Sequence, residues 1–421
     1  MSIFSRFFPG QKEEYLPALA ALLDARGIPA DEPCLNNELL ATFDSFRASE
    51  REAFADAVAG LYSKGLPLPP AWRDAQYELL PQVVPTWQGQ RDPYLFYPCF
   101  DNLCKRLLAY GKPVPPEWLT LWDISEDEAN SIALEHLEEK TKDKPFARQA
   151  SGIYRSNFGD GLDASRILLP DCWSQLFPCQ NTFVAIPRQD LMLVAPQILL
   201  PKLVEAVGES LKESGRELLV ATMYQWVGSK LMPASLQEPH PMIQPQREFR
   251  QMDSLAAYAA QAAELVKMDI GEPCHLGMVQ TKQGRTLTVA TWLDGKPALV
   301  PDSDLIGFIS SNGKPLGFYW RQTLPRIQRL KGDQVDIWGP RRLQFTSFPS
   351  KEELSELECF APAEIHAQIL GQNAPQKHQL PSGGPPQSQS RQSEAASAAM
   401  SNNSPVPAHL RGLSLGIQDD D

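Results

Sequence analysis

Two short apolar runs joined by a tight loop constrain the fold of this chain more than any other feature. Thr182 to Ile186 and Leu191 to Ala195 are partly β-branched, and only the four residues 187–190 separate them. Strands joined by so short a loop pair antiparallel. A helical stretch from Leu199 to Glu213 and a third strand from Leu218 to Val227 follow them. These elements predict an α+β fold with largely antiparallel sheets rather than a doubly wound parallel sheet.

The length of the chain implies more than one such unit. A chain of 421 residues exceeds the usual domain of about 100 to 200 residues, so we expect several hydrophobic cores. Apolar side chains make up 43% of the residues, which is enough to fill those cores without disulfides. The patterning predicts a helical N-terminal module at 1–120, an α+β domain at 121–232, a linker at 233–253, a second α+β domain at 254–370 and a disordered tail at 371–421.

The second α+β domain combines one helix with several short strands. Its helix is expected from Leu255 to Met268, after a linker rich in proline and glutamine. Asp294-Gly295 and Asn312-Gly313 are typical of tight turns between strands. The expected strands lie near Leu276 to Thr281, Thr286 to Trp292, Gly317 to Trp320, Val335 to Trp338 and Leu343 to Phe348.

The composition of the chain changes after Gly371. Gln, Ser, Pro, Ala and Asn dominate from there, and large apolar residues are almost absent until Leu410. Such a segment cannot offset its ordering entropy by burial, so we predict disorder. The apolar stretch at 410–417 is a candidate docking motif, and the alternative is a frayed chain end.

A proline-rich motif occurs twice in the N-terminal module. Gly65 to Trp72 reads GLPLPPAW, and Gly111 to Trp118 reads GKPVPPEW. Each copy follows a run that we interpret as helical and that ends near a tyrosine, Tyr62 or Tyr110. Two interpretations are open: a two-copy helical repeat with extended connectors, and a motif that ends a helix and buries an indole.

The charge of the protein argues against nucleic acid and anionic lipid as partners. The net charge is −12 and the isoelectric point is about 5.1, so the average surface repels phosphate groups. No run of about 18 uncharged apolar residues occurs, and the first residues lack the apolar core of a secretion signal. We therefore expect a cytoplasmic protein without a membrane span.

The cysteines and histidines form no recognisable metal or nucleophile motif. The seven cysteines contain no C-x-x-C pair, and the six histidines are dispersed. The sequence contains no G-x-S-x-G, P-loop or H-E-x-x-H motif. No cofactor and no structural metal are expected from these residues.

The densest polar motif runs from Gly159 to Arg166 and reads GDGLDASR. It follows Leu121 to Glu128, where a capping sequence at Ser125 predicts a helix over about 125–140, and it precedes Val184 to Asp190. In this order the motifs resemble the YtpQ-like bacterial family of unknown function, over residues 110–230. The resemblance implies a cytoplasmic α+β domain and supplies no catalytic residue.

Three aspartates in this region admit two interpretations. Carboxylates at turns accept backbone N–H bonds, and Arg166 can pair with either Asp160 or Asp163. Alternatively, Asp160, Asp163 and Asp190 converge on a metal or act as acid and base, as in a metal-assisted hydrolase. Because no histidine accompanies them, we favour the structural interpretation.

Basic and aromatic residues gather near the end of the second domain, against the acidic balance of the chain. Interleaved arginine and tryptophan favour a protein partner, and the alternative is a sheet edge protected by charge. We therefore predict a non-catalytic protein-binding or adaptor protein that uses this cluster and the tail motif. The predicted binding residues are Trp320, Arg321, Arg326, Arg329, Trp338, Arg341 and Arg342, with Leu413, Leu415 and Ile417 in the tail.

Overall fold

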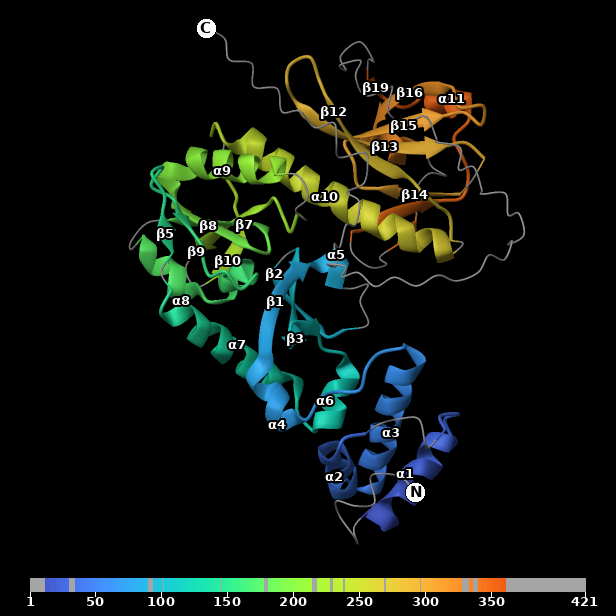
Figure 1. The fold of residues 1–421 in the computed structure, drawn as a ribbon. Coiled ribbons are helices and arrows are strands. Elements are labelled where there is room, and N and C mark those ends of the chain that lie inside the picture. The colour runs from blue at the N-terminus through green and yellow to red at the C-terminus, as the bar shows by residue number, and fades with distance from the viewer. Residues whose placement is uncertain are drawn as a thin grey trace, which may run out of the picture.

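The predicted α+β class is confirmed by a computed structural model, in which helices alternate with largely antiparallel sheets (Figure 1). None of the helices in the described residues is long and apolar enough to span a membrane. The predicted tail lies outside the described residues. These are 12–29, 35–89, 94–100, 102–144, 146–177, 181–213, 218–227, 230–237, 239–268, 270–295, 297–327, 333–335 and 340–360.

The chain begins with a small helical core. It contains α1 (Lys12–Asp24), α2 (Asn37–Ser45) and α3 (Ala48–Ser63). Asn36 caps α2 by accepting the Leu39 N–H at 2.9 Å. The rings of Phe43 and Phe54 meet edge to face at 5.4 Å in the centre of this core.

The N-terminal module is less helical than predicted, because residues 79–113 form a sheet. Its strands are β1 (Leu79–Pro85), β2 (Phe96–Phe100), β3 (Leu103–Ala109) and β4 (Lys112–Pro113), in the order β1-β3-β2 with β4 beside β3. The run Leu103–Ala109 has no strict alternation, so its sequence is equally compatible with a helix. The segment forms a strand because it pairs with β1 and buries Leu107 and Ala109.

The two proline-rich motifs lie against each other rather than forming a repeat. The helical-repeat interpretation is wrong, because the second copy follows strand β3 and leads into α6 (Pro116–Trp122). The indole N–H groups of Trp118 and Trp122 donate to the carbonyls of Pro67 and Pro70, at 2.9 and 2.8 Å. Both of these indoles are buried, so the second interpretation is confirmed for the burial of Trp118. Trp72 of the first copy is only half-buried, and the second copy follows a strand rather than a helix. A short helix, α4 (Trp72–Ala75), and the turn η2 (Gln76–Glu78) complete the first copy.

The central unit confirms the helix predicted at 125–140. Helix α7 (Glu126–Lys142) begins where Ser125 accepts the Glu128 N–H at 3.2 Å. The predicted hairpin is also confirmed, with strands that reach Arg188 and Leu191 and so leave a shorter loop than expected. Helix α5 (Thr86–Gly89) lies between β1 and β2 of the N-terminal sheet. The other elements of the central unit are β5 (Ala147–Arg148), β6 (Tyr154–Arg155), η3 (Asp163–Leu168), α8 (Pro170–Trp173), η4 (Ser174–Leu176), β7 (Thr182–Arg188), β8 (Leu191–Pro196), η5 (Gln197–Leu199), α9 (Leu200–Lys212), β9 (Met223–Val227) and β10 (Lys230–Pro233).

The central sheet has the strand order β10-β9-β7-β8-β6-β5, and both of its faces are covered. Leu200, Leu203 and Val207 recur at helical spacing and place α9 on one face. Trp173 and the η3 turn pack on the other face, together with Val83 of β1. The N-terminal sheet and the central sheet therefore share a core.

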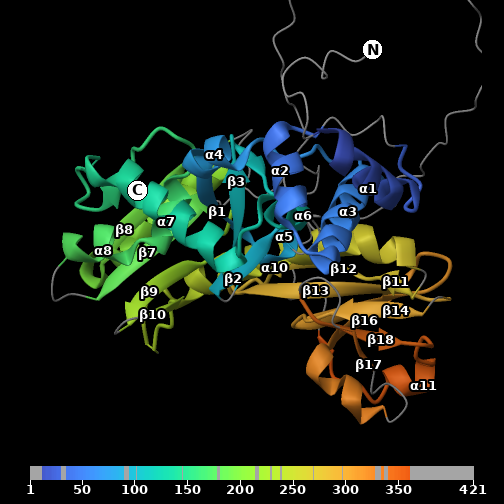
Figure 2. The same cartoon turned by 90° about the horizontal axis from the view of Figure 1, so that it is seen from below.

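The predicted linker at 233–253 is wrong from residue 243 onward. Helix α10 (Ile243–Leu265) is a single 23-residue helix that includes the helix predicted from Leu255 and ends in η6 (Val266–Met268). Pro245 is tolerated because it lies in the first turn, where the backbone N–H has no helical acceptor. Figures 1 and 2 show α10 running from the central sheet to the C-terminal sheets.

The C-terminal unit confirms the strands predicted near 276, 286, 317 and 343. The sequence missed β11, β14, β15 and β19, and the strand predicted at 335–338 is described only up to Val335. Two sheets form, with orders β11-β14-β18-β17 and β12-β13-β15-β16-β19. The elements are β11 (Glu272–Pro273), β12 (His275–Gln280), β13 (Thr286–Leu293), β14 (Ala298–Pro301), β15 (Leu305–Ile309), β16 (Pro315–Trp320), η7 (Arg321–Arg326), β17 (Asp333–Val335), β18 (Arg342–Phe345), α11 (Lys351–Leu354) and β19 (Cys359–Phe360).

Candidate functional site

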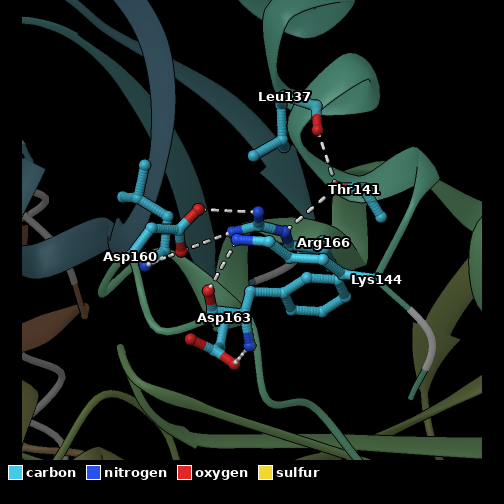
Figure 3. A network of polar contacts seen from close by, with 8 residues as sticks. Leu137, Thr141, Lys144, Asp160, Asp163 and Arg166 are labelled. Carbon is cyan, nitrogen blue, oxygen red and sulfur yellow. Dashed lines mark hydrogen bonds and ion pairs between the residues drawn. The ribbon is translucent and has the colours of Figure 1, made fainter.

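Arg166 is the centre of the polar network around the GDGLDASR motif (Figure 3). Its side chain is completely buried between α7 and the loop that precedes η3. The guanidinium lies over the ring of Phe158, with its central carbon 4.2 Å from the ring centroid. Its Nε donates to the Thr141 hydroxyl at 3.1 Å, and Thr141 in turn donates to the Leu137 carbonyl at 2.6 Å. The arginine therefore ties the loop to the last turns of α7.

Asp160 neutralises this buried charge. The two carboxylate oxygens accept from the two terminal nitrogens of Arg166 at 2.8 and 2.7 Å, which is a bidentate pair. Oδ1 also accepts the Leu162 N–H at 3.0 Å. Burial by itself would raise the pKa of Asp160, but the bonds from Arg166 and Leu162 outweigh it and lower the pKa below its usual value. Asp160 is therefore held as a carboxylate.

Asp163 stabilises the same loop from inside the protein. Its side chain is buried, and Oδ1 accepts the Phe158 N–H at 3.2 Å. The Lys144 ammonium donates to the Phe158 carbonyl at 3.1 Å. Both polar groups of the Phe158 backbone are thus bonded to side chains, and Asp163 fixes the turn as the structural interpretation predicts.

Asp190 belongs to a different ion-pair cluster, at the β7–β8 hairpin. It accepts from Nε of Arg188 at 3.0 Å, and Glu213 accepts from another nitrogen of the same arginine. Arg188 is buried, whereas Asp190 and Glu213 are about half exposed. Within the described ranges, no group of three His, Cys, Asp or Glu side chains could hold a metal ion. The structure thus gives each aspartate a basic or amide partner of its own.

The residues of the predicted basic aromatic cluster do not form one surface in the structure, because each has different neighbours. Arg321 pairs with Asp302 at 2.9 Å, and Arg326 lies 3.7 Å from Glu358. The Trp320 ring packs edge to face on Phe360 at 5.5 Å, across the last strand pair of the sheet. Acidic side chains therefore neutralise part of the cluster. Arg341 is exposed, and Arg329, Trp338, Leu413, Leu415 and Ile417 lie outside the described residues.

Arg342 is a correction to the predicted binding residues, because it lies inside the protein. It is 1% exposed and stacks on Tyr258, with the guanidinium carbon 5.0 Å from the ring centroid. Burial lowers its pKa to about 10. Such a side chain cannot contact a partner. Its nitrogens donate to Gln261 Oε1 at 2.7 Å and to the carbonyls of Cys274, Leu299 and Tyr258 at 3.0, 2.9 and 3.0 Å.

The free edge of the five-stranded sheet was not among the predicted binding features. Strand β12 ends that sheet and pairs with β13, from His275 opposite Thr291 to Gln280 opposite Thr286. The Thr281 N–H donates to the Arg285 carbonyl at 2.9 Å, so odd-numbered residues of β12 bond to β13 and even-numbered residues face away. The N–H and C=O groups of Leu276, Met278 and Gln280 therefore point outward.

Among the described residues, this edge has no strand partner from the start of β12 onward, and it is free in that sense. The preceding residue, Cys274, still uses its N–H to bond the Leu299 carbonyl of β14 at 3.0 Å. From Leu276 to Gln280, no other strand of the described residues pairs beyond β12, and helix α10 packs against this strand. The strand itself was predicted from the sequence. Its position at the edge depends on the order of strands far apart in the chain, which no local pattern contains.

Comparison with protein-family models, curated proteins and solved structures finds no match to this chain. The resemblance to the YtpQ-like family stays a prediction.

Proposed function

We propose that the chain is a non-catalytic, cytoplasmic protein-binding protein of the YtpQ-like kind, and that it binds an extended peptide along the free edge of β12. The single observation that supports this proposal is the row of outward N–H and C=O groups at Leu276, Met278 and Gln280. Adding a strand to such an edge satisfies these groups, and main-chain bonds then supply the affinity.

The side chains around this edge suit an apolar peptide. Leu276 and Met278 are half-buried on one face of β12, so a peptide beside them covers apolar surface that water now contacts. Natural edge strands are usually protected by charge or proline. Between His275 and Gln280 this strand has neither a charged side chain, if His275 is taken as neutral, nor a proline. The edge is therefore suited to pairing.

The polar clusters around Arg166 and Arg342 are engaged within the protein itself. Arg166 and Arg342 are buried and bonded within the protein, and Asp160 is held by Arg166. A metal-assisted hydrolase using Asp160, Asp163 and Asp190 lacks a comparable observation, because each carboxylate is engaged by its own neighbours. With a net charge of −12, nucleic acid is not the proposed partner.

Selection of peptides from a random library against the full chain tests this proposal. We expect the selected peptides to alternate apolar and small or polar residues, which is the strand period. They should slow amide hydrogen exchange at Leu276, Met278 and Gln280 of the wild-type chain. Met278→Pro removes one outward N–H without touching a bond to β13 and should abolish binding, whereas Met278→Leu keeps the N–H and should bind normally.

The hydrogen-exchange measurement uses the wild-type chain. It therefore tests peptide binding at the β12 edge even where Met278→Pro fails to fold. Selected peptides that leave the three outward amides of the wild-type chain unprotected would remove the basis of the proposal.

A further inference from the structure

We infer that residues 413–417 of the same chain are the resident occupant of the β12 edge. The inference rests on the proposed function and names the segment that pairs with this edge when no partner is bound. These residues lie outside the described part of the chain.

The sequence of this segment has the period of a strand. Leu413, Leu415 and Ile417 alternate with Ser414 and Gly416, which places the three apolar side chains on one face when the backbone is extended. The same spacing does not form a helical stripe, which needs apolar residues three or four apart. Paired with β12, the apolar row packs beside Leu276 and Met278.

The length of the chain allows this pairing within one molecule. The described residues end at Phe360 of β19, on the opposite side of the sheet from β12. Four strand spacings of about 4.8 Å separate the two edges, or about 20 Å. Residues 361–412 are rich in Ala, Ser, Gln and Pro, and a flexible connection of this length has a root-mean-square span of about 40 Å. The edge therefore lies well within reach, and no second molecule is needed.

Charge complementarity favours one direction of pairing. The turn that follows β12 carries Lys282 and Arg285, both exposed, whereas the segment is followed by Asp419 to Asp421. A segment running parallel to β12 places these aspartates beside the turn. Pairing in this direction should weaken with salt and with Lys282→Glu, Arg285→Glu.

The inference makes the tail a competitor of the external peptide. A partner must displace residues 413–417, which are present at the high effective concentration of a tethered ligand. Removing the tail contacts should therefore tighten peptide binding. A partner peptide therefore binds the edge only when its affinity is high enough to compete with residues 413–417.

Amide hydrogen exchange on the full-length chain tests the inference. In the wild type, the N–H groups of Leu276, Met278 and Gln280 should exchange on the order of tenfold more slowly than in Leu415→Asp. The N–H groups of Gly277 and Val279 bond to β13 and should not differ. Ser414→Asp adds the same charge on the opposite face of the segment and should retain the protection.

Three results would overturn the inference: equal exchange in the wild type and Leu415→Asp, equal loss in Ser414→Asp and Leu415→Asp, and protection that increases with protein concentration. The last result would assign the edge to the tail of a second copy. Adding a selected peptide to Leu415→Asp separates the two proposals. Protection of the three amides by the peptide supports edge binding even where the tail inference fails, and its absence removes both.

Discussion

At the scale of single residues, the side chains of two adjacent arginines lie in opposite environments, one buried and one exposed. Arg342 donates to Gln261 and to three backbone carbonyls inside the protein, whereas Arg341 is exposed. Arg342→Ala leaves several buried acceptors without a donor and should lower the free energy of unfolding by about 3 kcal/mol or more. Arg341→Ala should change it by about 0.5 kcal/mol or less. Urea denaturation measures both, and equal effects would contradict the assignment of Arg342.

The sequence predicted some of these residue roles and missed others for a physical reason. Ser125 as a cap and the pairing of Arg166 with an aspartate involve neighbours in the chain, so local chemistry was sufficient. The burial of Arg342 on strand β18 depends on Tyr258 and Gln261, which lie on helix α10, about 80 residues earlier in the chain. Neighbouring basic residues look alike in sequence, and only long-range packing distinguishes them.

Asp253 on α10 makes stability depend on pH. Its carboxylate accepts the N–H groups of Ala221 and Thr222 at 2.6 and 2.8 Å, and burial raises its pKa to about 6. The folded protein therefore binds more protons than the unfolded chain between about pH 4 and 6, so this contribution to stability falls as the pH rises through that range. Relative to Asp253→Asn, the wild type should lose on the order of 1 to 3 kcal/mol between pH 4 and 7.

Unfolding free energies of the two proteins at several pH values test this prediction. A constant difference from pH 4 to 7 would show that Asp253 does not titrate in this range. A wild-type stability that rises from pH 4 to 7, relative to the variant, would reverse the predicted sign.

At the scale of elements, the proline-rich segment and α6 form one packing unit. The carbonyls of Pro67 and Pro70 are three residues apart in the chain, and each accepts an indole N–H of α6. Trp122→Phe removes one donor and part of the ring, and we expect a loss of about 1 to 2 kcal/mol in unfolding free energy. The exposed Tyr77→Phe is the control and should have little effect. Equal stability of the two variants would contradict the role of the indole bond.

The strands of the central unit show which elements a sequence specifies. The β7–β8 hairpin and α9 were predicted, because the short loop between the two strands and the helical spacing of the apolar residues in α9 are visible in the local sequence. The third strand was predicted from Leu218 but begins at Met223. Ala221 and Thr222 donate their N–H groups to Asp253 rather than to a neighbouring strand, so a side chain distant in sequence shortens the element.

At the scale of the whole molecule, α10 connects units that the sequence separated by a linker. Phe249 lies in the core of the central sheet, and Met252 packs against that core. Later in the same helix, the Tyr258 hydroxyl donates to the Arg341 carbonyl at 2.8 Å, and Gln261 donates to the Pro340 carbonyl at 2.8 Å. Proline and glutamine suggested a linker because they are common in connections. The helix forms because both ends of it have a surface to pack on.

This shared helix predicts that the central and C-terminal units unfold together. Phe249→Ala creates a cavity in the central core and should cost about 3 to 5 kcal/mol. Because α10 packs on both units, the lost stability should affect both of them. Under native conditions the N–H groups of Val194 in the central sheet and Leu305 in the C-terminal sheet should therefore both exchange faster. Phe43→Ala removes an equally buried ring from the N-terminal helical core and should leave Leu305 unchanged. Unchanged exchange at Leu305 in Phe249→Ala would show that the units open independently despite the continuous helix.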